Sequence, residues 1–565
     1  MFSAICIKIE TIQEVGLSMN LEQISQAVIG ANQPFPTPFG MKPMVYADYT
    51  ASGRSLSFIE DTILHKVMPT YANTHTEFSF SGSQTGRYRE QARSIIHKAV
   101  NGCESDKVIF CGTGATSAIN KLVSILGIRL PEELADKYKF DQLIPQSERP
   151  VVFVGPYEHH SNELPWRESI ATVVTIPEDS DGNIDLKLLE LSLQKYNDRP
   201  LKIGSFSAAS NVTGIRSDVT QISRLLKQYQ ALSCWDYAAA APYIKIDMNG
   251  EVPIDAVFFS PHKYVGGPGT PGVLVIKQEI MNNKVPAIVG GGTVSYVTPY
   301  DHKYIDDKVI REEGGTPGIV EAIRAGLVVK LQQDVGIDVI QEREEALIQQ
   351  VLTRLAKIDN IKVLGNTSVP RLSIFSLRFM HNGRDLHHGF ITSLFNDVFG
   401  IQVRGGCSCA GPYGHHLLNI NLEQSRELEA IVSDGYGLFK PGWVRLNFNY
   451  FISQDELDYL LTAIELIAKY GYRLLPYYQA NTATGNWRFQ GQKRQYDDSL
   501  EEITFNGDKE GVIAVHQPDY MELLSAAEQI LSADYSEKET YNLKFPTEIE
   551  PMRWFTLSED IMTPS

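Results

Sequence analysis

The sequence predicts an α/β protein whose main unit is a mostly parallel sheet with helices on both faces. Six short apolar runs alternate with stretches of helical periodicity. Nearly continuous apolar strands are typical of parallel sheets, because helices cover both faces of such a sheet. The runs lie at residues 108–110, 151–154, 173–176, 201–205, 256–259 and 272–276.

A smaller α+β unit is expected after this sheet. Helical patterns at 337–358 and 454–470 flank two apolar runs at 372–377 and 443–448. Strands and helices in so short a span are typical of an α+β domain. The predicted divisions are an amino-terminal arm (1–44), a large domain (45–334), a small domain (335–475) and a carboxy-terminal extension (476–565) to which the sequence assigns no role.

Three segments outside these patterns have simpler interpretations. A short helix is expected at about 21–28, and the proline-rich stretch 33–38 is interpreted as an arm that leads into the fold. The charged segment 131–150 interrupts the alternation of strands and helices, so it is expected to form a surface helix and a loop.

Composition and charge exclude several classes of protein. The chain carries a formal net charge of −17, which disfavours binding to the phosphate backbone of nucleic acids. No run of about 18 apolar residues is present, and the amino-terminal apolar stretch is too short for a signal peptide. The protein is therefore predicted to be cytoplasmic, with no membrane partner and with its six cysteines as free thiols.

Three short segments carry an anion cradle, a carboxylate and an amine. The glycine-rich turn at 111–120 follows an apolar run and opens a helical pattern, so its backbone N–H groups can hold a phosphate. Asp236 ends an apolar run, and Lys263 follows the run 256–259, where partial burial favours a reactive amine. A cofactor with a phosphate and an aldehyde needs all three groups. Taken singly, an ordinary turn, a helix N-cap and a surface lysine are the alternative interpretations.

Together these segments resemble the class V aminotransferase group of fold-type I pyridoxal-phosphate enzymes. The resemblance is greatest to cysteine desulfurases and selenocysteine lyases, and it covers about residues 45–470. It implies a large cofactor-binding domain with a seven-stranded type of sheet, a smaller α+β domain and a homodimer. Its landmarks occur in the family's order, at 46–51, 73–75, 158–162, 210–214, 290–292, 313–317 and Arg445.

The resemblance implies a role for each site residue. Lys263 would carry pyridoxal 5'-phosphate as a Schiff base and move the Cα proton, Asp236 would pair with the ring nitrogen, and His159 would stack on the ring. Asn211 would lie near the ring hydroxyl and the substrate, and Arg445 would clamp the substrate carboxylate. The residues implied to bind the phosphate are Ala115, Thr116, Ser260, His262 and, from a second subunit, Thr316.

The segment 403–412 resembles the mobile loop of cysteine desulfurases, in which an arginine precedes a nucleophilic cysteine by five residues. This register makes Cys409 the nucleophile and Arg404 a substrate contact. The chain would then be a sulfurtransferase that converts L-cysteine to alanine, with a persulfide on Cys409 for an acceptor protein. The preceding Cys407 and Ser408 instead resemble the amino-terminal domain of molybdenum cofactor sulfurases, which use the same chemistry.

Several alternatives stay open at the level of sequence. Either Cys407 or Cys409 can be the nucleophile, and both can be inert residues of a tight loop. No metal site is expected, because the second cysteine pair of a zinc site is absent. Ala239 replaces a glutamine that is typical of desulfurases, so the rival functions are another class V reaction (an aminotransferase, an epimerase, a selenocysteine or C–S lyase) and a noncatalytic sulfur carrier or scaffold.

Overall fold

The computed structural model describes residues 20–74, 76, 78–492, 499–501, 503, 505 and 518–562. Three sequence predictions lie partly outside these residues. They are the amino-terminal arm, of which 1–19 are not described, the landmark at 73–75, which includes His75, and the carboxy-terminal extension.

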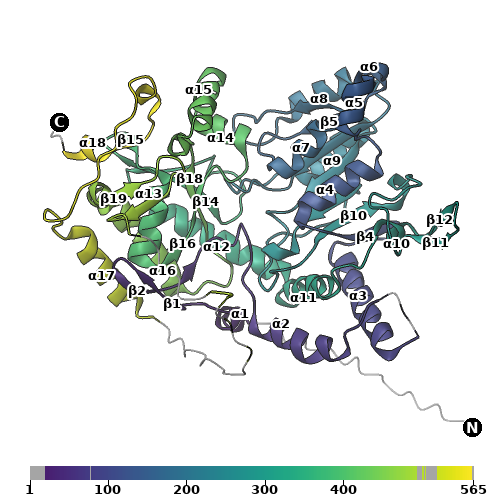
Figure 1. Cartoon of the computed structure of the whole chain (residues 1–565), viewed down its shortest axis with the longest axis horizontal. Helices are drawn as coiled ribbons and strands as arrows, with labels where there is room; N and C mark the ends of the chain where they lie inside the picture. Colours follow the sequence, from purple (N-terminus) through teal and green to yellow (C-terminus); the bar gives the residue numbers. More distant parts are fainter. Residues whose placement is uncertain are drawn as a thin grey trace, which may run out of the picture.

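The large unit is built on a seven-stranded sheet (Figure 1). Strand β10 runs antiparallel to its two neighbours, β4 and β9, while the other neighbouring strands pair in parallel. The prediction of a mostly parallel sheet is therefore confirmed. In sheet order the strands are β4 (Asp106–Cys111), β10 (Gly272–Lys277), β9 (Ala256–Phe259), β8 (Leu232–Asp236), β7 (Lys202–Ser207), β5 (Val151–Val154) and β6 (Thr172–Thr175).

Helices cover both faces of this sheet, as predicted. In β4, Val108 and Phe110 point into one core and Ile109 and Cys111 into the other, because successive side chains of a strand alternate between faces. The first core contains residues of α3 (Phe80–Ala99), α8 (Leu186–Lys195), α9 (Val219–Gln228) and α11 (Ile319–Val335), and the second contains residues of α4 (Gly114–Ile125) and α7 (Leu164–Arg167).

Short elements surround the large sheet. The charged segment 131–150 forms α5 (Glu132–Tyr138) and α6 (Phe140–Leu143), which confirms the expected surface helix. The others are α2 (Ser57–Thr62), α10 (Lys308–Glu312) and the hairpin of β11 (Val294–Val297) and β12 (His302–Tyr304).

A second, antiparallel sheet follows in the chain. Strand β14 begins at Ile374, two residues later than predicted, because Leu372 donates its N–H to the carbonyl of Gly214. In order the strands are β13 (Ile361–Val363), β14 (Ile374–His381), β18 (Trp443–Asn447) and β17 (Arg404–Gly406), and β15 (Arg384–Asp385) also pairs with β14. The helices are α12 (Ile337–Leu355), α13 (His388–Leu394), α14 (Gly411–Leu417), α15 (Leu422–Ser433) and α16 (Gln454–Tyr470).

The amino-terminal region is partly as predicted. Helix α1 (Leu21–Ala27) begins after Asn20, whose side chain accepts the N–H of Glu22 and forms a capping box with Gln23. The proline-rich stretch is not a plain arm, since it forms a hairpin of β1 (Pro34–Thr37) and β2 (Gly40–Pro43). The next strand, β3 (Val45–Tyr46), pairs in parallel with β16 (Ile401–Gln402), so the start of the chain joins the second unit.

The described part of the carboxy-terminal extension belongs to the core of the second sheet. Trp487, Phe489, Tyr520, Leu531 and Phe555 are buried in the same cluster as β14 and α16. No helix in the described part of the chain is long and apolar enough to span a membrane. The elements of the extension are β19 (Tyr478–Ala480), β20 (Trp487–Phe489), α17 (Tyr520–Ser532) and α18 (Ser558–Met562).

Candidate active site

A cavity of 520 Å³ lies at the carboxyl ends of β8 and β9, where residues of both sheets meet. Polar strand ends at this edge are expected to contact a ligand, because the loops that follow the strands open there. Of the predicted site residues, Thr316 is not among the lining residues. The others line the cavity together: Ala115, Thr116, His159, Asn211, Asp236, Ser260, His262, Lys263, Arg404, Cys409 and Arg445.

Lys263 ends a short 3-10 helix, Pro261–Lys263, that directly follows β9. Burial of the ammonium group lowers the pKa of Lys263 to about 8, although the carboxylate of Asp236 opposes this shift. At pH 7 about one tenth of the Lys263 side chains therefore carry a neutral amine, and this fraction rises with pH. Such an amine can attack a carbonyl group.

Asp236 is the last residue of β8 and is buried. Its Oδ1 accepts the N–H of Ala238 at 2.7 Å, and a turn rather than a helix follows, so Asp236 is not a helix N-cap. Burial raises the pKa of the Asp236 carboxyl, while the Ala238 N–H and Lys263 oppose that rise. A buried carboxylate in this position is suited to a cationic ring nitrogen.

The anion cradle is formed by the first turn of α4 and by side chains from two other segments. The Ala115 N–H donates to Ser260 Oγ at 2.8 Å, and the hydroxyl groups of Thr116 and Ser161 lie 2.7 Å apart. Gly114 has φ +57°, and a Cβ on it would lie 2.9 Å from Ser260 Oγ, so a glycine is needed at this approach. Converging N–H and hydroxyl groups at a helix N-terminus fit a phosphate monoester.

His159 lies on the same cavity with a neutral ring. Its Nδ1 accepts the N–H of Ser161 at 3.1 Å. Burial lowers the pKa of His159 to about 3, and Lys263 adds to that shift. The preceding Glu158 is buried and accepts hydrogen bonds from Ser207 Oγ at 2.6 Å and Asn162 Nδ2 at 2.6 Å, which fixes the turn that presents His159.

Two arginines that line the cavity share a buried carboxylate, Asp48, to which the sequence analysis gave no role. Asp48 Oδ1 accepts from Arg445 Nη2 at 3.1 Å, and Asp48 Oδ2 accepts from Arg404 Nε at 3.0 Å. Arg445 Nη1 also donates to the carbonyl of Asn211 at 3.1 Å. The only sequence signal for Asp48 was its place in the landmark at 46–51.

The two cysteines of the loop differ in their surroundings. The Ala410 N–H donates to the carbonyl of Cys407 at 3.3 Å, which closes a tight turn, and Ser408 and Cys409 both have positive φ, at 55° and 56°. Cys409 is exposed and lines the cavity, whereas Cys407 packs against the core of the large sheet.

Two hydrogen bonds join this turn to the large unit. Asn211 Nδ2 donates to the carbonyl of Ser408 at 2.8 Å, and the His160 N–H donates to the carbonyl of Cys409 at 3.0 Å. The histidines that follow the turn bond elsewhere, His415 to Gly411 and Ser425, and His416 to Glu178. Among the described residues, no three His, Cys, Asp or Glu side chains are grouped as metal ligands.

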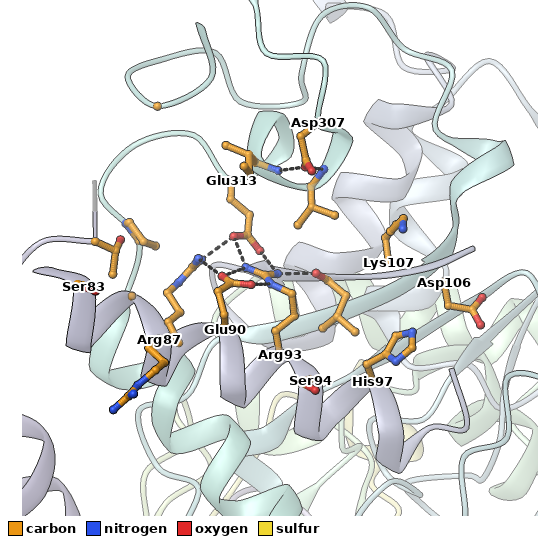
Figure 2. A pocket seen from close by; sticks show the side chains of 18 of the residues that line it. Ser83, Arg87, Glu90, Arg93, Ser94, His97, Asp106, Lys107, Asp307 and Glu313 are labelled. Atoms are coloured by element: carbon orange, nitrogen blue, oxygen red, sulfur yellow. Dashed lines mark hydrogen bonds and ion pairs between the residues drawn. The ribbon is translucent and has the colours of Figure 1, made fainter. Parts of the chain in front are cut away.

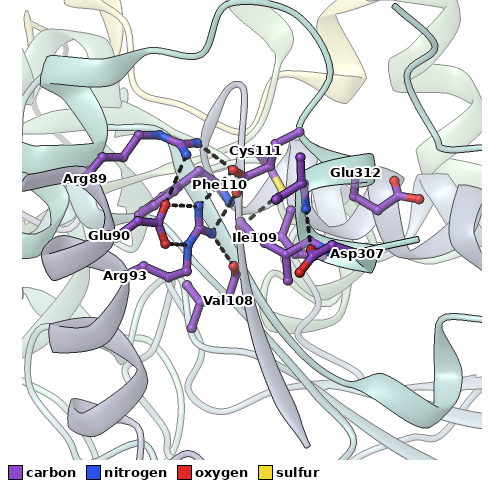
Figure 3. A network of polar contacts seen from close by, with 12 residues as sticks. Arg89, Glu90, Arg93, Val108, Ile109, Phe110, Cys111, Asp307 and Glu312 are labelled. Atoms are coloured by element: carbon purple, nitrogen blue, oxygen red, sulfur yellow. Dashed lines mark hydrogen bonds and ion pairs between the residues drawn. The ribbon is translucent and has the colours of Figure 1, made fainter. Parts of the chain in front are cut away.

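A second, open cavity of 1060 Å³ lies between α3 and α10 and borders the strand that leads to the anion cradle. Figure 2 shows Glu313 pointing toward Arg93, with Glu90 on the other side of that guanidinium. Glu313 also accepts the N–H of Phe110 in β4 at 2.7 Å. Figure 3 shows Arg89 and Arg93 next to Phe110 in this network. Burial alone would raise the pKa of Glu313, but Arg93 and Arg89 hold it below its usual value.

Thr316 follows this network by three residues and is exposed. Its predicted contact with the cofactor of a second subunit stays a prediction. The neighbouring Glu312 accepts from Lys121 Nζ of α4, at 3.4 Å. The loop that carries Thr316 is therefore held to α4, whose first turn forms part of the anion cradle, and to β4, which leads to that turn.

The fold and the site define an α/β enzyme of the fold-type I group. The family described as aminotransferase class V matches residues 45–460. The chain belongs to the class V aminotransferase family.

Similar proteins carry one recurring name. A probable cysteine desulfurase of Halalkalibacterium halodurans is 29% identical over 374 residues, which cover 66% of this chain and 85% of that protein. Another from Streptomyces coelicolor is 25% identical over 431 residues, which cover 76% of this chain and 93% of that protein.

Solved structures of cysteine desulfurases share the fold. The apo structure from Thermococcus onnurineus has a TM-score of 0.61 and 22% identity. The match covers 75% of this chain and 95% of that chain. The structure from Escherichia coli has a TM-score of 0.60 and 19% identity, with coverage of 79% and 98%. At these identities the structural likeness concerns the fold.

Proposed function

We propose that this chain is a pyridoxal-phosphate-dependent cysteine desulfurase. The observation that carries the proposal is that Cys409, Lys263 and Asp236 line one cavity. The names of the similar proteins support the same reaction. L-Cysteine and the Cys409 thiol would give L-alanine and a Cys409 persulfide, because the sulfur leaves the substrate Cβ and bonds to Cys409 Sγ.

The residues of the cavity fit pyridoxal 5'-phosphate. The anion cradle suits its phosphate, Lys263 Nζ suits its aldehyde, and the buried carboxylate of Asp236 suits its ring nitrogen. When bound, the cofactor supplies an electron-accepting ring that stabilises negative charge on the substrate Cα. Ala239 is buried on the cavity wall and offers no hydrogen bond to the ring hydroxyl, so Asn211 is the polar side chain proposed for that side.

Each remaining residue has a defined task in this proposal. Arg445 and Arg404 bind the substrate carboxylate, and Lys263 Nζ takes the Cα proton and returns a proton to the product. His159 presents a neutral ring to the cofactor. Cys409 attacks the substrate sulfur as a thiolate, since the thiolate is the nucleophilic form of cysteine.

The proposal extends to the assembly and its partner. We infer a homodimer in which Thr316 reaches the phosphate of the second subunit, and an acceptor protein that takes sulfur from the persulfide. A cytoplasmic location is proposed because the cysteines of the described chain are free thiols, which suits a reducing compartment.

The first test is the release of alanine and sulfide from L-cysteine by the cofactor-loaded protein with dithiothreitol present. Cys409→Ala is expected to reduce turnover at least about 100-fold because the nucleophile is lost. Cys407→Ala is the matched control and is expected to retain turnover, since Cys407 packs against the core. Full activity of Cys409→Ala would contradict the proposal.

The products and the cofactor spectrum separate the rival functions. An oxo acid, a racemised amino acid or another cleavage product would indicate a different class V reaction. Lys263→Ala is expected to lose the absorbance band of the covalently bound cofactor. A wild-type protein without that band would indicate a noncatalytic carrier or scaffold.

A further inference from the structure

The buried carboxylate of Asp48 lies between two guanidinium groups that line the cavity, although Asp48 is not itself a lining residue. Its two oxygens are used separately, Oδ1 by Arg445 at 3.1 Å and Oδ2 by Arg404 at 3.0 Å. Asp48 and Arg445 are buried, while the Arg404 side chain is 51% exposed. One carboxylate therefore neutralises one of the two positive charges on this wall.

The position of Asp48 is fixed by backbone pairing that involves three distant segments. The Ala47 N–H donates to the carbonyl of Gln402 at 3.0 Å, and the Ala47 carbonyl accepts the N–H of Asn447 at 3.0 Å. Arg404 lies two residues after Gln402, and Arg445 lies two residues before Asn447. Because Ala47 is held between these two strands, the next residue is held between the two arginines.

Donor groups remain on this wall after Asp48 is bound. A guanidinium has five N–H donors. In the described structure, Arg404 uses only its Nε, for Asp48, so both of its terminal nitrogens can bind a ligand. Arg445 uses Nη1 and Nη2, and its buried Nε has no hydrogen-bond partner among the described residues.

The charges on the wall have a consequence for the ligand. Two guanidinium groups and one carboxylate leave a net charge of one positive unit, which a single ligand carboxylate neutralises. A second anionic group on the ligand would find no unneutralised guanidinium on this wall, because Asp48, in contact with both arginines, already neutralises one of them. Like charges placed close together at a recognition site reduce affinity strongly.

We propose that Asp48 sets the charge specificity of this site, so that it accepts α-amino acids with one carboxylate and an uncharged side chain and disfavours those with a second anionic group. The inference rests on the proposed function, because Arg445 and Arg404 are the substrate-binding residues of that proposal. It assigns the substrate class by charge and does not depend on the fate of the substrate sulfur.

L-Asparagine and L-aspartate provide the test, because they differ little in shape and by one charge. Their dissociation constants are measured on the cofactor-loaded protein from the change in cofactor absorbance and by calorimetry. The ratio of the aspartate constant to the asparagine constant is expected to exceed one in the wild type. Asp48→Asn is expected to lower this ratio at least about tenfold, because the repelling carboxylate is gone.

Two further variants keep the test decisive. Asp334→Asn changes the net charge equally at an exposed pair with Lys330 and is expected to leave the ratio unchanged. Arg404→Gln removes one positive charge from a half-exposed position and is expected to raise the ratio, and it decides the question if Asp48→Asn does not fold. An unchanged ratio in Arg404→Gln, or in folded Asp48→Asn, would overturn the proposal.

The binding test is independent of the desulfurase reaction. Neither ligand contains sulfur, so a protein that fails to release sulfide from L-cysteine can still show the expected change in the ratio. In that case the proposed function is wrong and the role of Asp48 stands. Desulfurase activity together with an unchanged ratio would give the opposite result.

Discussion

The two walls of the cavity are built on strands of different kinds. On the cofactor side, Asp236 ends β8 and Lys263 follows β9, and both are buried strands paired on both edges within the seven-stranded sheet. On the thiol side, Cys409 follows β17, a three-residue strand at the edge of the second sheet.

The backbone that leads to the reactive side chain also differs between the two walls. The lysine follows its strand through a short helix, whereas the cysteine lies in a turn with two consecutive positive φ angles at non-glycine residues, which is a strained conformation. Edge strands and loops open more easily than buried central strands. The difference teaches that the groups proposed to hold the cofactor are placed by central strands, while the thiol proposed to accept sulfur depends on a few contacts with neighbouring segments.

The largest expected effect is a loss of folding stability when the ion-pair network beside the cofactor wall is broken. Glu313→Gln removes a carboxylate whose side chain is 7% exposed, and the exposed Glu90 is then the carboxylate that Arg89 and Arg93 still contact. Loss of one partner of a buried ion pair costs about 3–5 kcal/mol in the free energy of unfolding. Urea unfolding measures this change.

Glu90→Gln is the matched control for Glu313→Gln. Glu90 contacts the same Arg93, but its side chain is 61% exposed, so the loss is expected to stay below about 1 kcal/mol. Equal losses in the two variants would contradict the view that burial of Glu313 stabilises the strand before the cradle.

A smaller effect is expected behind the thiol wall, at Trp554 of the carboxy-terminal extension. Its ring stacks on His388 at 5.9 Å between ring centroids, and its Nε1 donates to the carbonyl of Phe439 at 2.9 Å. His388 in turn lies against β17, since a Cβ on Gly405 would be 3.0 Å from its Nδ1. Trp554→Ala is expected to cost about 2 kcal/mol of stability through lost apolar burial.

Two chemical measurements, one on each wall, show which wall the substitution affects. In Trp554→Ala, alkylation of Cys409 by iodoacetamide, followed by peptide mass spectrometry, is expected to change in rate, while cofactor uptake at Lys263 is unchanged. Met521→Ala, at a 76% exposed position on α17, serves as the control. Equal changes at both walls would mean that the extension stabilises the whole chain rather than the thiol side.

The smallest change is a shift in pH dependence on the cofactor side. With a pKa of about 8 for Lys263, the neutral fraction of its amine, and with it the rate of cofactor uptake, rises about tenfold from pH 7 to pH 9. His159 and His262, with pKa values lowered by burial to about 3 and about 4, stay neutral throughout this range.

Asp236→Asn tests the cause of this pH dependence. The Asp236 carboxylate raises the pKa of Lys263 against the effect of burial, so its removal is expected to move the midpoint of the uptake profile to lower pH. Stopped-flow absorbance over pH 6 to 10 measures the midpoint, with the range chosen to span roughly two units on either side of that pKa. A midpoint that moves upward would contradict this assignment.

Much of the cofactor side could be predicted from the sequence. The strands before Asp236 and Lys263 are nearly continuous apolar runs, and the cradle is a glycine-rich turn, so each group has a local signal. Helix α16 has the predicted bounds, 454–470, because its apolar residues recur with helical spacing.

Other features had no such signal. Strands β19 and β20 are only three residues long, so the pattern of the extension was too weak to indicate that it packs into the second core. The hairpin at residues 34–43 was hidden by its prolines, which usually argue against a strand except at an edge.

The sequence by itself determined the α/β class, the parallel sheet and the residues around the proposed cofactor, because these depend on local periodicity and on motifs of a few residues. Only the tertiary structure decided that Cys409 and not Cys407 lines the cavity, and that Asp48 lies between Arg404 and Arg445. The contacts of Asp48 join segments about 350 to 400 residues apart. The periodicity of side chains within one segment does not indicate which distant segment it will contact.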